Sequence, residues 1–275
     1  MTRSPDPLER IAAALERLSP PPHAPIVGKA EAYHWDGQAV RVARHFSPLP
    51  LSLLGGIDAQ RDALLDNSWR LSRGHGAHDI LLWGAKGSGK SALVKAGVGA
   101  VQAGGGALAL VEIAVDHLGS LPALFDQLAR WDIASIVLID DLGFDAGQAG
   151  VRGLRSVLDG GISARPANVR LYVTSNKRTI VARDMAEQAA AVNARDVLDD
   201  QLALADRFGL SLGFHACDQD MYLGIIAKYA AHLGLDYEPA DALQWAVQRG
   251  SRSGRVAWHY VVELAGRAGK PQFPV

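Results

Sequence analysis

Residues 80–91 read ILLWGAKGSGKS, a short apolar run followed by the pattern G-x-x-x-x-G-K-S. The apolar run predicts a buried strand, and the residues from Lys90 to about Ala103 predict a helix. In such a unit the glycines let backbone N–H groups converge on phosphate oxygens at the positive end of the helix. We therefore expect a nucleoside triphosphate here, the alternative being a glycine-rich turn with an incidental lysine. The expected nucleotide-binding residues of the loop are Gly84, Ala85, Lys86, Gly87, Ser88, Gly89, Lys90, Ser91 and Ala92.

Two side chains of this loop have distinct expected roles. Lys90 should neutralise the β- and γ-phosphates, and the hydroxyl of Ser91 should coordinate Mg²⁺. ATP and Mg²⁺ are therefore the expected cofactors.

Around the loop, the chain alternates between short apolar runs and helical patterns. Strands that are apolar on both faces and are separated by helices predict a parallel sheet covered on both sides, a three-layer αβα fold. After about residue 215 only helical patterns follow, which predicts a small all-helical lid domain. The expected strands are 80–83, 107–115, 136–139, 169–174 and 210–212, and the expected helices are 90–103, 121–131, 149–158, 195–207, 221–233, 241–249 and 254–267.

The first 50 residues differ from the rest. Leu8 to Leu18 has apolar residues at helical spacing, prolines 20–22 predict a stiff linker, and Asp36-Gly37 suits the turn of a β-hairpin. We therefore expect three parts: an N-terminal appendage over 1–50, a nucleotide-binding domain over 51–215 and a helical lid over 216–275.

Polar side chains follow two of the expected strands. The run 136–139 leads directly into Asp140 and Asp141, and the run 171–174 leads into Ser175 and Asn176. Because ligands bind at the carboxyl ends of strands in open α/β sheets, these side chains should lie beside the phosphate loop. Asp140 is then the expected carboxylate on the Mg²⁺ side, and Asp141 the candidate base for an attacking water. The alternatives are a solvated strand end for the acids and an ordinary turn residue for Asn176.

The arrangement resembles the AAA+ ATPases over most of residues 51–268. Residues 138–142, LIDDL, and 174–176, TSN, are similar to the clade of replication initiators, helicase loaders and transposition-helper ATPases. A closer resemblance is to a family of bacterial ATP-binding proteins of unknown function. It is carried by the segments LDGGISARP at 158–166, DRFGL at 206–210 and RSGRVAW at 252–258.

This resemblance implies further site residues. Gly56 and Ile57 belong to a segment expected to pack on adenine, and Asn176 is the expected first sensor. Arg207 is expected to supply an arginine finger to the nucleotide of a neighbouring subunit, and Arg255 is the expected second sensor. For both arginines the alternative is a surface ion pair.

One departure from the AAA+ pattern concerns Asp141. Many AAA+ enzymes have glutamate at this position, and aspartate is shorter by one methylene. We therefore expect slow hydrolysis that depends on assembly of subunits.

Composition limits the remaining possibilities. The chain has 275 residues, of which 48% are hydrophobic and 21% charged, with a net charge of −1 and one cysteine, Cys217. There is no overall basic field for nucleic acid. Residues 1–10 do not resemble a signal peptide, no run approaches 18 apolar residues, and a lone cysteine suits a reducing compartment, so we expect a cytoplasmic protein.

The sequence leaves three functions open. The first is a Mg²⁺-dependent AAA+ ATPase that self-associates through Arg207 and acts on a client, either DNA or a protein. The others are a small-molecule kinase with the same phosphate loop and a nucleotide sensor without hydrolysis. His75 and His78 make a poor metal site, and Arg152, Arg155 and Arg165 could contact a partner or form a solvated helix face.

Overall fold

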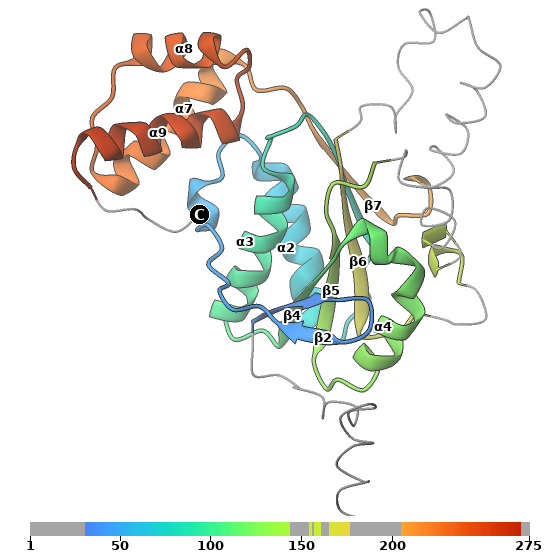
Figure 1. Cartoon of the computed structure of the whole chain (residues 1–275). Helices are drawn as coiled ribbons and strands as arrows, with labels where there is room; N and C mark the ends of the chain where they lie inside the picture. The colour runs from blue at the N-terminus through green and yellow to red at the C-terminus, as the bar shows by residue number, and fades with distance from the viewer. Residues whose placement is uncertain (1–30, 144–153, 156, 161–164, 177–204, 271–275) are drawn as a thin grey trace, which may run out of the picture.

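The computed structural model describes residues 31–143, 154–155, 157–160, 165–176 and 205–270. In this part of the chain seven strands form one sheet in the order β2-β1-β4-β5-β6-β3-β7 (Figure 1). The strands are β1 Ala32–Trp35, β2 Val40–Val42, β3 Ile80–Gly84, β4 Leu108–Ile113, β5 Ala134–Ile139, β6 Val169–Ser175 and β7 Leu210–Phe214. The helices are η1 Leu51–Leu53, α2 Asp58–Ser72, α3 Lys90–Ala103, η2 Val115–Ser120, α4 Leu121–Leu128, α7 Gln219–Leu233, α8 Pro239–Gln248 and α9 Gly254–Arg267.

Helices cover both faces of the sheet, as the strand pattern predicts (Figure 1). Along β3, Ile80 and Leu82 belong to the core under α2 and α3, whereas Leu81 belongs to the core under α4. Since successive strand residues point to opposite faces, a strand that is apolar throughout must be covered twice. The predicted three-layer sheet is confirmed. The expected helix 8–18, most of 195–207 and much of 149–158 lie outside the described residues.

The N-terminal hairpin forms part of this sheet, which corrects the prediction that it belongs to a separate appendage. β1 pairs in parallel with β4, and β2 pairs antiparallel with β1 at the edge, so the sheet is mixed. Tyr33 and Trp35 are only 2% and 3% exposed. The Trp35 indole donates to the Ser120 hydroxyl over 2.7 Å. A hairpin separate from the sheet would expose the large apolar area of these two rings to water. The hairpin therefore packs as part of the sheet.

Helix α2 has no counterpart among the predicted elements. Its buried residues are Leu64, Asn67, Ser68 and Leu71, which lie on one helical face. The two polar residues of that face both contact the fully buried Tyr172, whose hydroxyl lies 3.1 Å from Asn67 Nδ2 and 2.9 Å from Ser68 Oγ. Burial raises the pKa of Tyr172 to about 12, so the phenol stays protonated and bridges α2 to β6.

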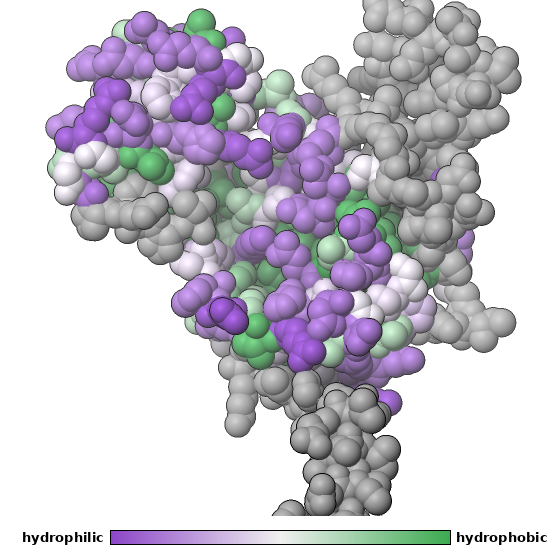
Figure 2. Space-filling model, in the orientation of Figure 1, coloured by the Kyte–Doolittle hydropathy of each residue, from purple (hydrophilic) through white to green (hydrophobic). Residues whose placement is uncertain are grey.

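The C-terminal helices α7, α8 and α9 pack around an apolar core of their own. Asp218 caps α7 by accepting from the Met221 N–H over 2.8 Å, and Ser253 caps α9 by accepting from the Val256 N–H over 3.2 Å. Leu53 of η1 joins this core and so connects it to the segment between β2 and α2. The surface of these helices in Figure 2 is mainly hydrophilic. Within the described residues no helix has the length and apolar character needed to span a membrane.

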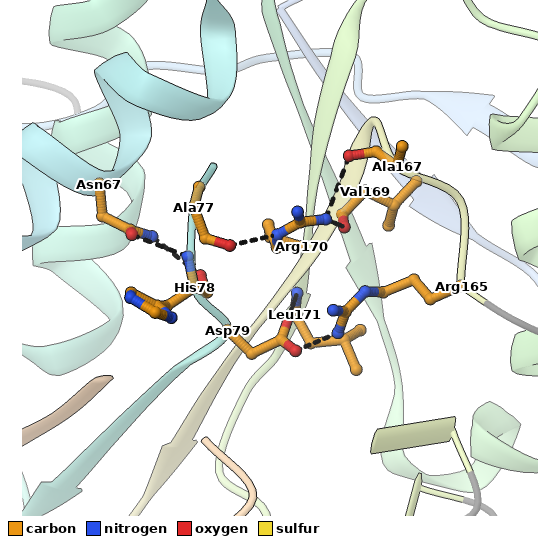
Figure 3. A network of polar contacts seen from close by, with 9 residues as sticks. All are labelled: Asn67, Ala77, His78, Asp79, Arg165, Ala167, Val169, Arg170 and Leu171. Atoms are coloured by element: carbon orange, nitrogen blue, oxygen red, sulfur yellow. Dashed lines mark hydrogen bonds and ion pairs between the residues drawn. The ribbon is translucent and has the colours of Figure 1, made fainter. Parts of the chain in front are cut away.

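Asp79 joins three segments at the sheet edge opposite the phosphate loop (Figure 3). Its carboxylate accepts from the Leu171 N–H over 2.7 Å and from the Arg165 guanidinium. Its carbonyl oxygen accepts from the Leu210 N–H over 3.2 Å. Arg165 is therefore engaged in the fold instead of lying on a solvated helix face. The described network ties together the starts of β3, β6 and β7.

We expect Asp79→Ala to lower the free energy of unfolding by about 2–3 kcal/mol, because it removes the acceptor of a buried N–H and of a cation. The Arg165 side chain is 22% exposed, so water compensates part of the loss. Urea denaturation measures the difference. The matched control is Asp126→Ala, at an exposed position of α4, which should change stability by less than about 0.5 kcal/mol. Equal stability of the two variants would contradict the role assigned to Asp79.

Candidate nucleotide site

A cavity of about 490 Å³ lies between the carboxyl edge of the sheet and the C-terminal helices. Such a volume is typical of small-molecule and cofactor sites. One side is polar and is formed by the phosphate loop and the ends of β5 and β6, whereas the other is apolar. The lining residues are Leu49, Leu53, Leu54, Gly55, Ile57, Lys86, Gly87, Ser88, Gly89, Lys90, Ser91, Ala92, Asp140, Asp141, Thr174, Asn176, Ile225, Tyr229, Gly254, Arg255 and Trp258.

Glycines in the phosphate loop are required by close approaches of other parts of the chain. A Cβ on Gly84 would lie 2.0 Å from the carbonyl oxygen of Phe214 in β7. One on Gly87 would lie 3.0 Å from the Ser253 hydroxyl at the start of α9. Both glycines also have positive φ, at 130° and 76°. The loop is thus held between β7 on one side and the C-terminal helices on the other.

The Lys90 side chain is folded back into the loop. Its Nζ donates to the carbonyl oxygens of Gly84 and Ala85 over 3.1 and 2.8 Å and to Asn176 Oδ1 over 2.9 Å. Burial lowers the pKa of Lys90, the charges of Asp141 and Asp140 oppose this effect, and Arg255 adds to it. Two cations and two acids therefore act on one another within the cavity. Such a set can hold a polyanion and balance its charge.

Asp140 and Asp141 are adjacent in sequence but have different partners. Asp140 Oδ1 accepts from the Ser91 hydroxyl over 2.5 Å and from the Thr174 hydroxyl over 2.6 Å. Asp141 has a φ of 54°. In the described part of the chain it is the only residue other than glycine with a positive φ. This left-handed conformation costs about 1–2 kcal/mol and turns the chain directly after β5. The Asp141 carboxylate accepts from Asn176 Nδ2.

Asn176 connects the two halves of the polar wall. Its carbonyl oxygen accepts from Lys90 Nζ, and its amide nitrogen donates to Asp141. The order β5-β6-β3 explains the contact, because β6 lies between the strand that carries the acids and the strand that leads into the loop. An amide that both donates and accepts is suited to hold a water beside a phosphate.

The opposite wall is contributed by α7, α9 and the segment before α2. The Arg255 N–H donates to the Gly87 carbonyl over 3.3 Å, so the first turn of α9 touches the phosphate loop. Tyr229 and Trp258 meet edge to face with ring centroids 5.1 Å apart. Together with Leu54 and Ile57 they give the apolar half of the cavity the surface that an aromatic base requires.

The sequence matches a known family model over most of its length. The model of a family described as "Protein of unknown function (DUF815)" matches residues 28–268. The chain belongs to this family. No curated protein matches it.

Solved structures that share the fold include the following three. The Thermotoga maritima RuvB Holliday junction branch migration motor is 17% identical, with coverage of 82% of this chain and 68% of that chain and a TM-score of 0.51. The Aeropyrum pernix Orc1 protein in complex with DNA is 15% identical, with coverage of 80% and 63% and a TM-score of 0.55. Domain III of the Thermotoga maritima replication initiation protein DnaA is 16% identical, with coverage of 82% and 94% and a TM-score of 0.52. The fold is that of the AAA+ P-loop NTPases, as the sequence resemblance implied.

The cavity brings together most of the predicted site residues, with two local differences. Gly84 and Ala85 are not among the lining residues, and their carbonyl oxygens accept from Lys90 Nζ. Gly56 has a φ of 74° and lies against Met221, and its neighbours Gly55 and Ile57 line the cavity in its place.

Arg207 lies outside the cavity and forms an ion pair with Asp159. The sequence reasoning gave no role of their own to Thr174, Tyr229 or Trp258. Thr174 has no sequence signal of its own, because its place beside the acids follows from the register in which Ile139 of β5 pairs with Val173 of β6.

Proposed function

We propose that this family member is a Mg²⁺-dependent ATPase of the AAA+ type whose nucleotide state controls a macromolecular partner. The observation that carries the proposal is the meeting of Lys90, Asp140, Asp141, Asn176 and Arg255 around one cavity. A bound nucleotide alone would need only the phosphate loop and an apolar pocket for the base. The added acids and amide are the groups that hydrolysis requires.

In this proposal the phosphates of ATP lie on the loop, at the N-terminus of α3. Lys90 Nζ exchanges its bonds to the loop carbonyls and Asn176 for β- and γ-phosphate oxygens. Arg255 binds the γ-phosphate from the opposite wall, and because it begins α9 it transmits the state of the nucleotide to the C-terminal helices. These helices then act as the lid of the site.

The oxygen donors at the end of β5 fit Mg²⁺. Ser91 Oγ and Asp140 Oδ1 are 2.5 Å apart, and hydroxyl and carboxylate oxygens are the donors that this ion prefers. In the described residues no three histidine, cysteine, aspartate or glutamate side chains form a metal cluster. The proposed ion is accordingly held by Ser91, by Asp140 directly or through water, and by the phosphates. When bound, it neutralises the charge of the triphosphate.

Hydrolysis in this proposal uses Asp141 as the base. Its carboxylate accepts a proton from the water that attacks the γ-phosphorus, and the bond to the β–γ bridging oxygen breaks. Asn176 holds that water by its amide. The short aspartate side chain aligns the water less well than glutamate, so turnover by separate subunits is slow.

Assembly and client complete the proposal. Arg207 acts as a finger on the nucleotide of a neighbouring subunit, and its position outside its own cavity supports a role between subunits. One solved neighbour is in complex with DNA and another is a Holliday junction branch migration motor, which favours a DNA client, whereas the net charge of −1 favours a protein.

Phosphate release measured against protein concentration tests the proposal. With ATP and Mg²⁺ but no acceptor, we expect specific activity to rise with subunit concentration and to be lost on removal of Mg²⁺ with EDTA. Release that requires a small-molecule acceptor would indicate a kinase instead. ATP binding without turnover at every concentration would contradict the hydrolytic part of the proposal.

A further inference from the structure

Thr174 has the most connected hydroxyl in the described polar wall of the cavity. Its side chain is 1% exposed, and its hydroxyl donates to Asp140 Oδ1 over 2.6 Å and accepts from the Asp141 N–H over 2.8 Å. The single proton of the hydroxyl is directed to the carboxylate, which leaves its lone pairs for the amide. One buried group therefore contacts both acids, the first through its side chain and the second through its backbone.

The sheet register places Thr174 for this contact. Ile139 of β5 pairs with Val173 of β6, so Thr174 is the next position of β6, beside Asp140, which directly follows β5. The Thr174 carbonyl oxygen also accepts from the Leu142 N–H over 2.8 Å. The turn that follows β5 is thus fastened to Thr174 before and after Asp141.

This fastening determines where Asp141 points. Asp141 is left-handed, and a residue in that conformation persists only where the surrounding structure imposes it. With its N–H held by Thr174, Asp141 directs its carboxylate to Asn176 while Asp140 faces Ser91. Two adjacent acids are in this way given different partners.

We propose that Thr174 is a positioning residue whose hydroxyl holds Asp140 for the metal ion and Asp141 for the attacking water. The proposal rests on the function proposed above. A bound ion would take a lone pair of the Ser91 oxygen, whereas Thr174 only donates its proton to Asp140 and can keep this bond when the ion is bound. Groups that orient the ligands of a metal typically change affinity or activity by 10–100-fold when removed.

The test compares Thr174→Val, which keeps the shape and loses the hydroxyl, with Thr174→Ser, which keeps the hydroxyl. We expect Thr174→Val to lower kcat about 10–100-fold and to raise the Mg²⁺ concentration for half-maximal activity about 10-fold. ATP affinity in EDTA, measured with a fluorescent ATP analogue, should stay within about threefold, because the phosphate loop is intact. Thr174→Ser should remain within about threefold of the unchanged chain in all three quantities.

A control separates this role from a general effect of a buried hydroxyl. Ser135 is fully buried in β5 and its hydroxyl has no hydrogen-bond partner in the described part of the chain. Ser135→Ala should leave kcat and the Mg²⁺ requirement unchanged. If Thr174→Val does not fold, Thr174→Ala takes its place in the comparison.

Two results would overturn the inference: an unchanged kcat and Mg²⁺ requirement in Thr174→Val, or equal impairment in Thr174→Ser and Thr174→Val. Failure of the proposed function looks different, because then the unchanged chain itself releases no phosphate. In that case the effect of Mg²⁺ on binding of the ATP analogue still tests whether Thr174 positions the acids. A loss of that dependence in Thr174→Val alone supports the inference.

Discussion

Asp141→Asn should reduce ATP turnover by about 10²–10⁴-fold, the range typical for loss of a general base. Asparagine has nearly the same shape as aspartate and tolerates the left-handed conformation that position 141 requires, with its φ of 54°. Its side-chain oxygen can still accept the hydrogen bond from Asn176. The substitution therefore removes the proton acceptor and keeps the geometry of the wall.

ATP should remain bound to this variant, because Lys90 and the phosphate loop are unchanged. Single-turnover phosphate release and binding of a fluorescent ATP analogue measure the two effects separately. The matched control is Asp132→Asn. Asp132 is an exposed acid shortly before the first residue of β5, away from the cavity, so both quantities should stay unchanged. A turnover reduced less than about threefold would exclude Asp141 as the base.

The same variant can identify the client. Because it holds ATP without turnover, a client that binds the ATP-bound form should stay attached to it. Recovery of DNA whose binding weakens steeply with salt would indicate a nucleic-acid client, and a protein retained at high salt would indicate a protein client.

The central sheet was predictable because its strands carry their information locally. The run 136–139 is apolar on both faces and ends in acids, and the strand is buried along its whole length as β5. Helix α2 was not predictable from apolar spacing, since Asn67 and Ser68 occupy half of its buried face. They are stable there because Tyr172, more than 100 residues away, and the backbone of Leu64 and His78 provide their hydrogen-bond partners.

The N-terminal hairpin was also predictable only in part from the sequence. Its turn at Asp36-Gly37 was predictable, because Asp36 accepts from the N–H groups of Gln38 and Ala39 over 2.9 and 2.7 Å. Its pairing with β4 was not, because parallel partners are chosen by packing between segments far apart in sequence. Local turn chemistry therefore predicts that a hairpin forms, and tertiary contacts decide where it lies.

At the site, motifs predicted the residues that meet the nucleotide in our proposal but not the residues that hold them. Lys90, Ser91 and Asp140 stand at fixed spacings in the loop or at a strand end. Thr174 stands in a strand that reads as ordinary core, and its role depends on the register between β5 and β6. Supporting groups of this kind have no sequence signature of their own.

Arg207→Ala should lower ATP turnover by about 10³-fold at protein concentrations where the subunits associate, the scale on which arginine fingers act. At concentrations where subunits are separate, the variant and the unchanged chain should be equally slow. The reason is geometric: Arg207 pairs with Asp159 and is not among the residues that line the cavity of its own chain. Binding of the ATP analogue to the separate variant subunit should be unchanged.

Mixing two inactive variants tests whether Arg207 acts between subunits. Lys90→Ala subunits keep Arg207 but have a damaged phosphate loop, whereas Arg207→Ala subunits keep the loop but lack the finger. Mixed assemblies should regain activity that neither variant has alone. The matched control is Arg41→Ala, which removes another exposed arginine whose Nε pairs with an aspartate, at 2.9 Å from Asp36, and should have normal turnover. Activity that is independent of concentration and unaffected by Arg207→Ala would contradict the assembly-dependent mechanism and leave Arg207 as one member of a surface ion pair.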